Sequence, residues 1–565
     1  MTDSIDYEKF STATPSPASS IASADAFQCD VGSSLLVHPR REPFEYGLLA
    51  IPKLIFTDGT LSLSNLKDKL LRLPSPSPHR VDVANLADAL HISTVDAELV
   101  LDTLASVLPT DVANHESLDV RDLLLFLYIQ SYKRLLPKTH KDSAAVVDVW
   151  PRTSAFDGYL SALNPLQFKR STSRRFMPSP ADEEAHQLSY LDKHMANMVA
   201  LLADTTESDG EDSLVLTFDS FQHLGLLIQF SENEHKEVPL SQAAPFFVNS
   251  EAGIAAVSVC ASKALDWLLQ CIANSLEHIA AADKSPARES CMRNICDMDV
   301  SVPTHLRTQT VVEGISKASV MKQASEIMGH PVKVLNCHDS VIYLLAPLSY
   351  ATIYGCSDAT VVVGAVGKSL RVEYCERVQI ITAAKRICIV NCRECLFFLG
   401  INQKPLILGD NHNLQVAPFN TYYPQLEEHL FQVGVTVTIN RWNEPLVLGM
   451  VDPHDSLSHP AGASDIEPES ATCLDPNLFS NFLIPDWLLA NWVQSTKCNP
   501  FPLPEEYLVA QKRSHVVLDE IKEATSNLEL DEHKKRDIAS ALHMHFKDWL
   551  YASGNIRQLY CHQGE

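Results

Sequence analysis

Residues 361–369 contain residue types that could bind a nucleotide phosphate. They read VVVGAVGKS and end in the Gly-Lys-Ser of a phosphate-binding loop. That loop needs Gly-x-x-x-x-Gly-Lys-Ser/Thr, because unobstructed backbone amides must surround the phosphates. Here the first glycine position holds Val362, and Ser369 leads into the strand-like sequence LRVEY instead of a helix. We therefore interpret the stretch as a corner between strands.

The pair Cys392-x-x-Cys395 has the spacing of a redox pair or of half a zinc site. A structural zinc site needs a second ligand pair, and Cys291 and Cys296 form the only other close pair. A thioredoxin-like pair needs a βα context that this stretch lacks. We expect both thiols to pack in a core. A redox or zinc protein remains the alternative, which metal analysis of the purified protein would decide.

Other catalytic motifs give no further site. His543-x-His545 places its two side chains on different faces of a helix, which opposes chelation. The chain contains neither a Gly-x-Ser-x-Gly elbow nor a His-Glu-x-x-His helix. We expect no bound metal, no cofactor and no hydrolase chemistry.

Four cysteines mark a repeat that must position the glycine-rich stretch and the Cys392–Cys395 pair. Cys337, Cys356, Cys375 and Cys392 recur at intervals of 19, 19 and 17 residues, and each closes a short β-branched run. Self-similarity at such a period indicates one supersecondary unit stacked on copies of itself.

Aligning the runs gives two aliphatic ladders and one polar row. Residues two apart share a face of a strand, so both ladders point inward and the polar row points outward. The units are too short for crossover helices, and the pattern therefore predicts a parallel β-helix. The ladders are Val334, Ile353, Val372, Ile389 and Ile407, and Val332, Ala351, Leu370, Ile387 and Pro405; the outward row is Lys333, Thr352, Arg371 and Cys388.

The flanks have different patterns. We expect a disordered leader over 1–40, an all-α domain over 41–300, a mobile acidic loop over 451–482 and a C-terminal helical segment over 483–565. The last predicted helix carries an apolar stripe that we expect to dock on the rest of the protein; a partner-binding helix is the alternative. The stripe consists of Ile538, Leu542, Phe546, Trp549 and Leu550.

Composition restricts the class of partner. The formal net charge of −25 disfavours nucleic acid and anionic membranes. The first ten residues, MTDSIDYEKF, lack the basic start of a secretory signal, and the longest apolar run, 123–129, is too short to span a membrane. We expect a cytoplasmic protein whose fourteen cysteines are mostly reduced.

The coils resemble the C-CAP/cofactor C-like domain. The resemblance is carried by YATIYGC, LRVEYC, ICIVNCRECLFFL, Pro405-Leu406-Ile407 and Phe419-Asn420-Thr421-Tyr422-Tyr423-Pro424. Tubulin-binding cofactor C, the retinitis pigmentosa GTPase-activating protein and the adenylyl cyclase-associated proteins share this domain. The resemblance implies a right-handed parallel β-helix over 303–450, within a multidomain α plus β chain.

Segments outside that domain resemble the TBCC domain-containing branch, which is associated with centrosome and Golgi positioning. They are Glu42-Pro43-Phe44, LLFLYIQ at 124–130, Val312-Glu313-Gly314 and the terminal helix around Trp549-Leu550. The helical flanks differ from the spectrin-like domain of cofactor C, so this branch fits better than cofactor C itself.

The resemblance also implies where chemistry would occur. In catalytic members, a Gln-x-Arg motif on an exposed strand supplies an arginine finger to tubulin or to an Arf-like GTPase, which contributes about 10³–10⁵ in rate. The matching positions here are Arg386, Ile387 and Cys388, so the finger position holds a thiol without positive charge. Arg386 lies two residues away, about 6–7 Å along a strand, and we expect it to be a solvated or partner-contacting residue.

Our leading hypothesis is a non-enzymatic cytoskeletal scaffold at the centrosome, spindle pole or an equivalent microtubule-organising centre, which also acts in Golgi positioning. Its binding residues would be Lys385, Arg386, Cys388, Tyr422 and Tyr423. Its partners would be proteins, with tubulin or an Arf-like small GTPase as candidates. The alternative is a GTPase-activating protein for these partners that uses Arg386.

Overall fold

The protein is described by a computed structural model. Descriptions refer to residues 35–49, 51–54, 56, 60–72, 79–109, 117–135, 180–208, 211–232, 236–247, 258–283, 309–327, 330–448, 469–485, 499–527, 531–552 and 556–557. The predicted leader therefore lies outside the described residues up to position 34. Its last residues differ from the prediction, because Leu35–Pro39 form strand β1, which pairs antiparallel with β6, Ile228–Glu232.

Helices dominate the N-terminal domain, residues 35–283. The apolar run of α5 is completely buried, and α5 packs against α2, α4 and α7, as expected for a helix that is apolar all round. The helices are α1 (Glu42–Glu45), α2 (Thr60–Arg72), α3 (Val83–Leu90), α4 (Thr94–Val107), α5 (Val120–Leu135), α7 (Pro180–Leu202), α8 (Phe218–Gln222), α9 (Leu240–Ala243) and α10 (Ala261–Asp283).

Small antiparallel sheets accompany these helices, so the domain is not purely α-helical. β6 also pairs with β7, Lys236–Val238, and two further sheets join strands at the helix ends. Short strands lack a long alternating pattern, which is why the sequence did not indicate them. They are β2 (Arg80–Asp82) with β3 (Ser117–Asp119), and β5 (Glu211–Thr217) between β4 (Asp204–Ser208) and β8 (Ser258–Cys260).

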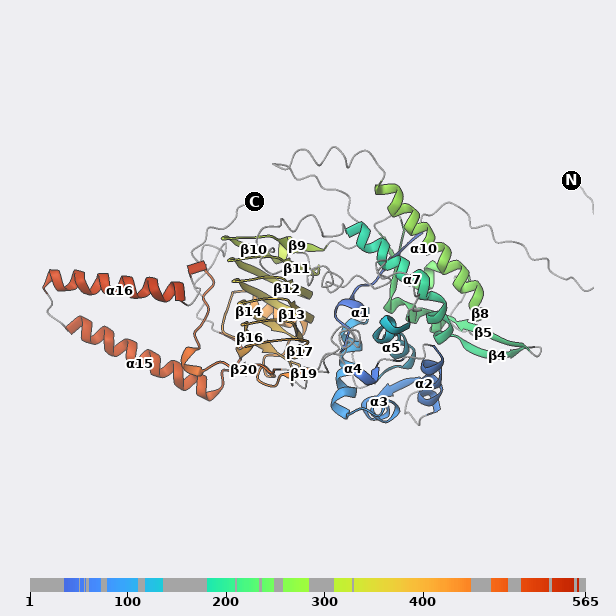
Figure 1. The fold of residues 1–565 in the computed structure, drawn as a ribbon, viewed down its shortest axis with the longest axis horizontal. Coiled ribbons are helices and arrows are strands. Elements are labelled where there is room, and N and C mark those ends of the chain that lie inside the picture. Colours follow the sequence, from blue (N-terminus) through green and yellow to red (C-terminus); the bar gives the residue numbers. More distant parts are fainter. Residues whose placement is uncertain are drawn as a thin grey trace, which may run out of the picture. The chain divides into compact units, whose positions relative to one another are not determined.

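The predicted parallel β-helix is present, and its strands stack layer upon layer (Figure 1). Every pairing in it is parallel. The strands are β9 (Thr310–Glu313), β10 (Ser319–Gln323), β11 (Val332–Leu335), β12 (Val341–Tyr354), β13 (Thr360–Glu373), β14 (Gln379–Ala384), β15 (Ile387–Val390), β16 (Leu396–Ile401), β17 (Leu406–Leu408), β18 (Gln415–Pro418), β19 (Leu446–Leu448) and β20 (Thr472–Cys473). A short helix, α12 (Ala324–Ile327), follows β10.

Two sheet faces are built along the stack. The first contains β9, β11, the second halves of β12 and β13, then β15, β17 and β19; we call it the first sheet. The second contains β10, the first halves of β12 and β13, then β14, β16, β18 and β20. The predicted ladder from Val334 to Ile407 is in register in the first sheet, and each of its residues is completely buried. The repeat thus predicted both the fold and its register.

Each of these coils turns a corner after a buried residue, which is a cysteine in four coils and Asn411 in the fifth. The residue that follows pairs in parallel with its equivalents, and the next residue has a positive φ. We call these two columns, which are exposed or half-buried, the corner ladder: His338, Ser357, Glu376, Arg393 and His412, followed by Asp339, Asp358, Arg377, Glu394 and Asn413.

The C-terminal part covers the second sheet and then extends into two long helices. The predicted mobile loop 451–482 differs from the structure from Glu469 onward, because β20 pairs with β18 and Phe479 and Phe482 are buried. These rings contact Phe398 and Tyr343 on the outer side of the second sheet. The helical elements here are α13 (Leu426–Val433), the 3-10 turn Pro476–Leu478, α15 (Glu505–Asn527) and α16 (Glu532–Ala552).

The predicted docking of the last helix is wrong for Leu542 and Phe546, whereas Leu550 at the end of the stripe is half-buried. In α16, Leu542 is 59% exposed and Phe546 is 55% exposed. The stripe has the correct helical spacing, but spacing alone does not decide whether an apolar face is covered. Among the described helices, none is both long enough and apolar enough to cross a membrane.

Candidate functional site: the first sheet and its cover

Arg386 lies just before β15 and is only 2% exposed. Its Nε donates to Oε1 of Gln403 at 2.8 Å, and its Nη1 donates to the hydroxyl of Thr103 in α4. Gln403 in turn donates to Asp102 at 3.1 Å. Burial lowers the pKa of Arg386, and the nearby Asp102 carboxylate opposes that shift. The expectation of a solvated Arg386 is therefore wrong, because a helix of the N-terminal domain covers it.

Cys388, at the finger position, is 6% exposed. It faces the part of the N-terminal domain that packs on the first sheet, which we call the cover. Its strand neighbour is Arg371, whose Nη1 lies 3.8 Å from the Cys388 sulfur. Arg371 forms an ion pair with the buried Glu373, so its guanidinium is already held. Burial raises the pKa of the Cys388 thiol, and the charge of Arg371 opposes the increase. No cation in this group points to solvent as an arginine finger must.

Arg371 was not recognised as a site residue from the sequence. The outward row already contained it beside Cys388, and that row was the signal that could have identified it. Thr103 and Gln403 gave no comparable signal, because nothing in the repeat links position 103 to position 386.

Hydrogen bonds fasten the cover to the first sheet. Tyr46 shares a hydrogen bond of 2.9 Å with Thr352, and its ring stacks on Tyr350 at a centroid distance of 4.5 Å. The Tyr350 hydroxyl donates to the Ser106 carbonyl at 2.6 Å. Lys368 donates to the Leu108 carbonyl at 3.0 Å. Because these bonds reach several coils, the cover is attached along the sheet and not at a single point.

Apolar contacts complete the cover. Leu406, Leu408 and Leu448 point outward from β17 and β19, yet they are buried and belong to the core of the N-terminal domain. Leaving three leucines in water would cost roughly 1.5–3 kcal/mol each. The outer face of the first sheet is thus an internal interface of this chain.

A buried ionic group lies at the same interface, next to β11. Glu45 accepts from Arg41 at 2.6 Å and from Lys333 of β11 at 3.2 Å. Burial disfavours the carboxylate, but the two cations outweigh burial and lower the pKa of Glu45 to about 2. The outward Lys333 predicted from the sequence therefore serves an internal ion pair.

The remaining predicted binding residues lie elsewhere. Lys385 and Tyr422 are half-buried. Tyr423 is 1% exposed and shares a hydrogen bond of 3.0 Å with His429 of α13. Only Lys385 and Tyr422 of the five predicted residues keep appreciable exposure, and the structure does not bring all five together on one open surface.

The phosphate-loop-like stretch lies inside the continuous strand β13. The predicted corner between two strands is therefore a register shift within one strand, where the chain passes from the second sheet to the first. Its glycines permit close packing of α13 and the segment before it. A Cβ at Gly364 would lie 2.6 Å from the Tyr423 hydroxyl, and one at Gly367 would lie 3.1 Å from Val433. The lysine of the motif is the Lys368 that bonds to Leu108.

The cysteine pair is packed as predicted. Cys392 and Cys395 are at most 1% exposed, and their thiols donate to the carbonyls of Val372 at 3.6 Å and Cys375 at 3.4 Å. In the described part of the chain, no three His, Cys, Asp or Glu residues gather in a way that could hold a metal ion.

The stacked coils, with their buried cysteines, form a parallel β-helix. Residues 329–446 match the family model described as Tubulin binding cofactor C. The chain thus contains a TBCC domain, and it resembles TBCC domain-containing proteins along most of its length.

Three relatives illustrate the extent of this similarity, all named TBCC domain-containing protein 1. The mouse protein is 26% identical over 471 residues, which cover 78% of this chain and 77% of the relative. The zebrafish protein is 24% identical and the match covers 78% and 75% of the two chains. The human protein is 23% identical and the match covers 79% and 78%.

Proposed function

We propose that this chain is a non-catalytic scaffold of the cytoskeleton that acts at a microtubule-organising centre. The observation that carries the proposal is the burial of Arg386 beneath α4. The finger position itself holds Cys388, which cannot neutralise charge on a transferring phosphate. A TBCC domain whose finger position is a thiol and whose nearby Arg386 is buried is suited to hold partners and not to accelerate their GTP hydrolysis.

The alternative function, GTPase activation through Arg386, requires the cover to open. Opening would break the hydrogen bonds from Arg386 to Thr103 and from Gln403 to Asp102, and it would expose Leu406, Leu408 and Leu448. At roughly 1.5–3 kcal/mol for each leucine, a partner would have to supply several kcal/mol before catalysis began. This cost favours the scaffold function.

The scaffold would bind its partners through surface that the chain leaves exposed. Within the described residues, the corner ladder offers charged side chains such as Glu376, Arg377 and Arg393 on a rigid stack. We propose this ladder as the binding face, in place of the covered first sheet. The family description names tubulin, which makes tubulin the first partner to test, followed by an Arf-like small GTPase.

The cellular role that we propose is positioning of the centrosome, spindle pole or equivalent centre, and of the Golgi. A fluorescently tagged full chain should concentrate at that centre. A variant with Glu376→Lys and Arg393→Glu on the corner ladder should become diffuse, while Arg386→Ala should remain concentrated. Localisation that depends on Arg386 and not on the ladder contradicts the proposed binding face.

Single-turnover GTP hydrolysis separates the scaffold from the activator. The full chain is added to tubulin and, separately, to Arf-like GTPases loaded with GTP. We expect no acceleration. The matched variants are Arg386→Ala and Lys385→Ala, whose folding is checked by thermal unfolding. Acceleration that Arg386→Ala abolishes and Lys385→Ala preserves would establish the activator and end the scaffold proposal.

A further inference from the structure

Two carboxylates project from equivalent positions of neighbouring coils at the corner ladder. Asp339 and Asp358 both have a positive φ, and each backbone N–H donates to the carbonyl of the next coil, at Ser357 and at Glu376. Neighbouring strands are separated by about 4.8 Å, so the two side chains form a pair that a planar guanidinium can bridge. The coil geometry, and not a flexible loop, sets their spacing.

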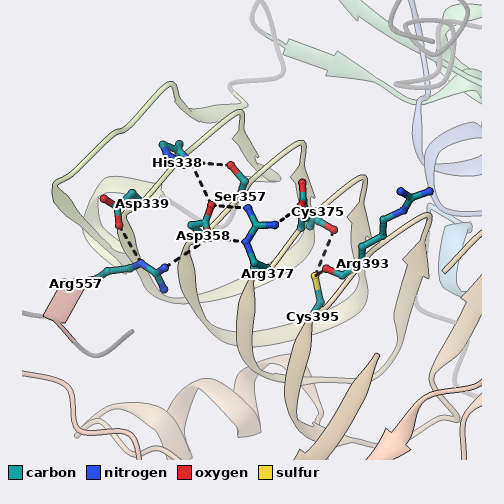
Figure 2. A network of polar contacts seen from close by, with 10 residues as sticks. His338, Asp339, Ser357, Asp358, Cys375, Arg377, Arg393, Cys395 and Arg557 are labelled. Carbon is teal, nitrogen blue, oxygen red and sulfur yellow. Dashed lines mark hydrogen bonds and ion pairs between the residues drawn. The ribbon is translucent and has the colours of Figure 1, made fainter. Parts of the chain in front are cut away.

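Arg557, from the C-terminal end of the chain, occupies this pair (Figure 2). Its Nε donates to Oδ1 of Asp339 at 3.1 Å, and its Nη2 lies 4.0 Å from Oδ1 of Asp358. The three side chains are 19%, 25% and 26% exposed, so they are much less open than the neighbouring pair of Arg393 and Asp410, at 61% and 58%. The residues that meet lie 218 positions apart in the sequence.

The surrounding charges favour a cation at this position. Arg377 approaches the far side of Asp358 with two hydrogen bonds, of 2.8 and 2.9 Å, and also pairs with Glu376. Without Arg557, the carboxylates of Asp339, Asp358 and Glu376 would therefore face one guanidinium, that of Arg377, and the imidazole of His338, which lies 3.8 Å from Asp358. Arg377, His338 and Arg557 together lower the pKa of Asp358, with Arg377 making the largest contribution.

We propose that Asp339 and Asp358 form a guanidinium-binding site, which Arg557 fills in cis and which fastens the far end of the C-terminal arm to the β-helix. The arm comprises α15, α16 and the turn at Ile556 and Arg557, residues 505–557. A ligand from another molecule would be an arginine carried by an extended segment, and it would have to displace Arg557.

The near end of the arm is attached separately. Tyr507, in the first turn of α15, donates to the Leu474 carbonyl at 2.6 Å, and its ring contacts Trp442 and Phe479. Between these two attachments, Val516, Leu518 and Leu542 are each about half exposed or more. Arg557 thus changes the arm from an element attached at one end into one attached at both. An ion pair that water still reaches in part is weak, so the far attachment can release.

Tryptic cleavage after Arg557 measures this attachment, because a docked arginine cannot enter the protease. Cleavage after Lys522 of α15, whose side chain is 75% exposed, is the reference within the same full-length chain. Mass spectrometry gives the rate of cleavage after Arg557 divided by the rate after Lys522. Global unfolding exposes both sites, so a change in global stability affects both rates, and the ratio reports opening of the Arg557 site. We expect Asp339→Asn to raise the ratio about two- to fivefold, and Asp339→Asn with Asp358→Asn to raise it further.

Asp410→Asn is the matched control, since Asp410 pairs with Arg393 on the same corner and does not touch Arg557. It should leave the ratio unchanged. Raising the salt concentration should increase the ratio for the natural chain and have little effect on Asp339→Asn. The proposal is overturned if Asp339→Asn leaves the ratio unchanged, or if Asp410→Asn raises it equally.

Discussion

The hydroxyl of Tyr350 in the β-helix donates to the carbonyl oxygen of Ser106 in α4 across 2.6 Å, although 244 residues separate them in the chain. The bond lies at the interface that buries Arg386 and Cys388. This hydrogen bond therefore contributes to holding the N-terminal domain on the first sheet.

Removing the Tyr350 hydroxyl should destabilise the chain. Tyr350→Phe leaves the Ser106 carbonyl without this donor, and we expect a loss of about 1–2 kcal/mol in the free energy of unfolding, measured by urea denaturation. Tyr343→Phe is the matched control, because the buried Tyr343 hydroxyl has no hydrogen-bond partner among the described residues. It should be neutral or slightly stabilising, and equal losses for the two variants would contradict the interface.

Stability should depend on pH through Glu45. Its pKa is about 2 in the folded chain against 4.5 ordinarily, so its contribution is complete above pH 4.5 and is lost as the pH falls toward 2. The difference corresponds to at most about 3 kcal/mol. Glu45→Gln should flatten the curve of unfolding free energy in this range. Glu326→Gln, at an exposed pair with Lys322, should leave the curve unchanged.

The stacking order of the coils could be predicted because the repeat contains it. Val334, Ile353 and Val372 recur at the period of one coil, and each occupies the same inward position in register. The period also separates inward from outward side chains, which identified Arg371 and Cys388 as outward. It cannot say what lies over an outward residue.

The cover of Arg386 could not be predicted for this reason. Thr103 belongs to a helix whose own pattern is satisfied within the N-terminal domain, and no motif connects it with position 386. The attachment of Arg557 to Asp339 is equally non-local. Long-range polar contacts between separately patterned segments are the part of this structure that the sequence does not indicate.

The glycine of the phosphate-loop-like stretch should matter for packing and not for nucleotides. A Cβ at Gly364 would lie 2.6 Å from the Tyr423 hydroxyl and 3.0 Å from the Ala346 carbonyl, so Gly364→Ala should cost about 1–3 kcal/mol in thermal or urea unfolding. At Gly225 the nearest atom is 3.9 Å away, and Gly225→Ala should be neutral or stabilising. Gly364→Ala that unfolds like the natural chain would be inconsistent with this packing.

The central claim, that the N-terminal domain covers the finger position, is tested most directly by the reactivity of Cys388. The native full chain is treated with iodoacetamide, and each cysteine is followed by peptide mass spectrometry. Cys392 in the core and the exposed Cys473 are the internal standards. The account predicts that Cys388 reacts as slowly as Cys392. A Cys388 that reacts as fast as Cys473 would contradict it.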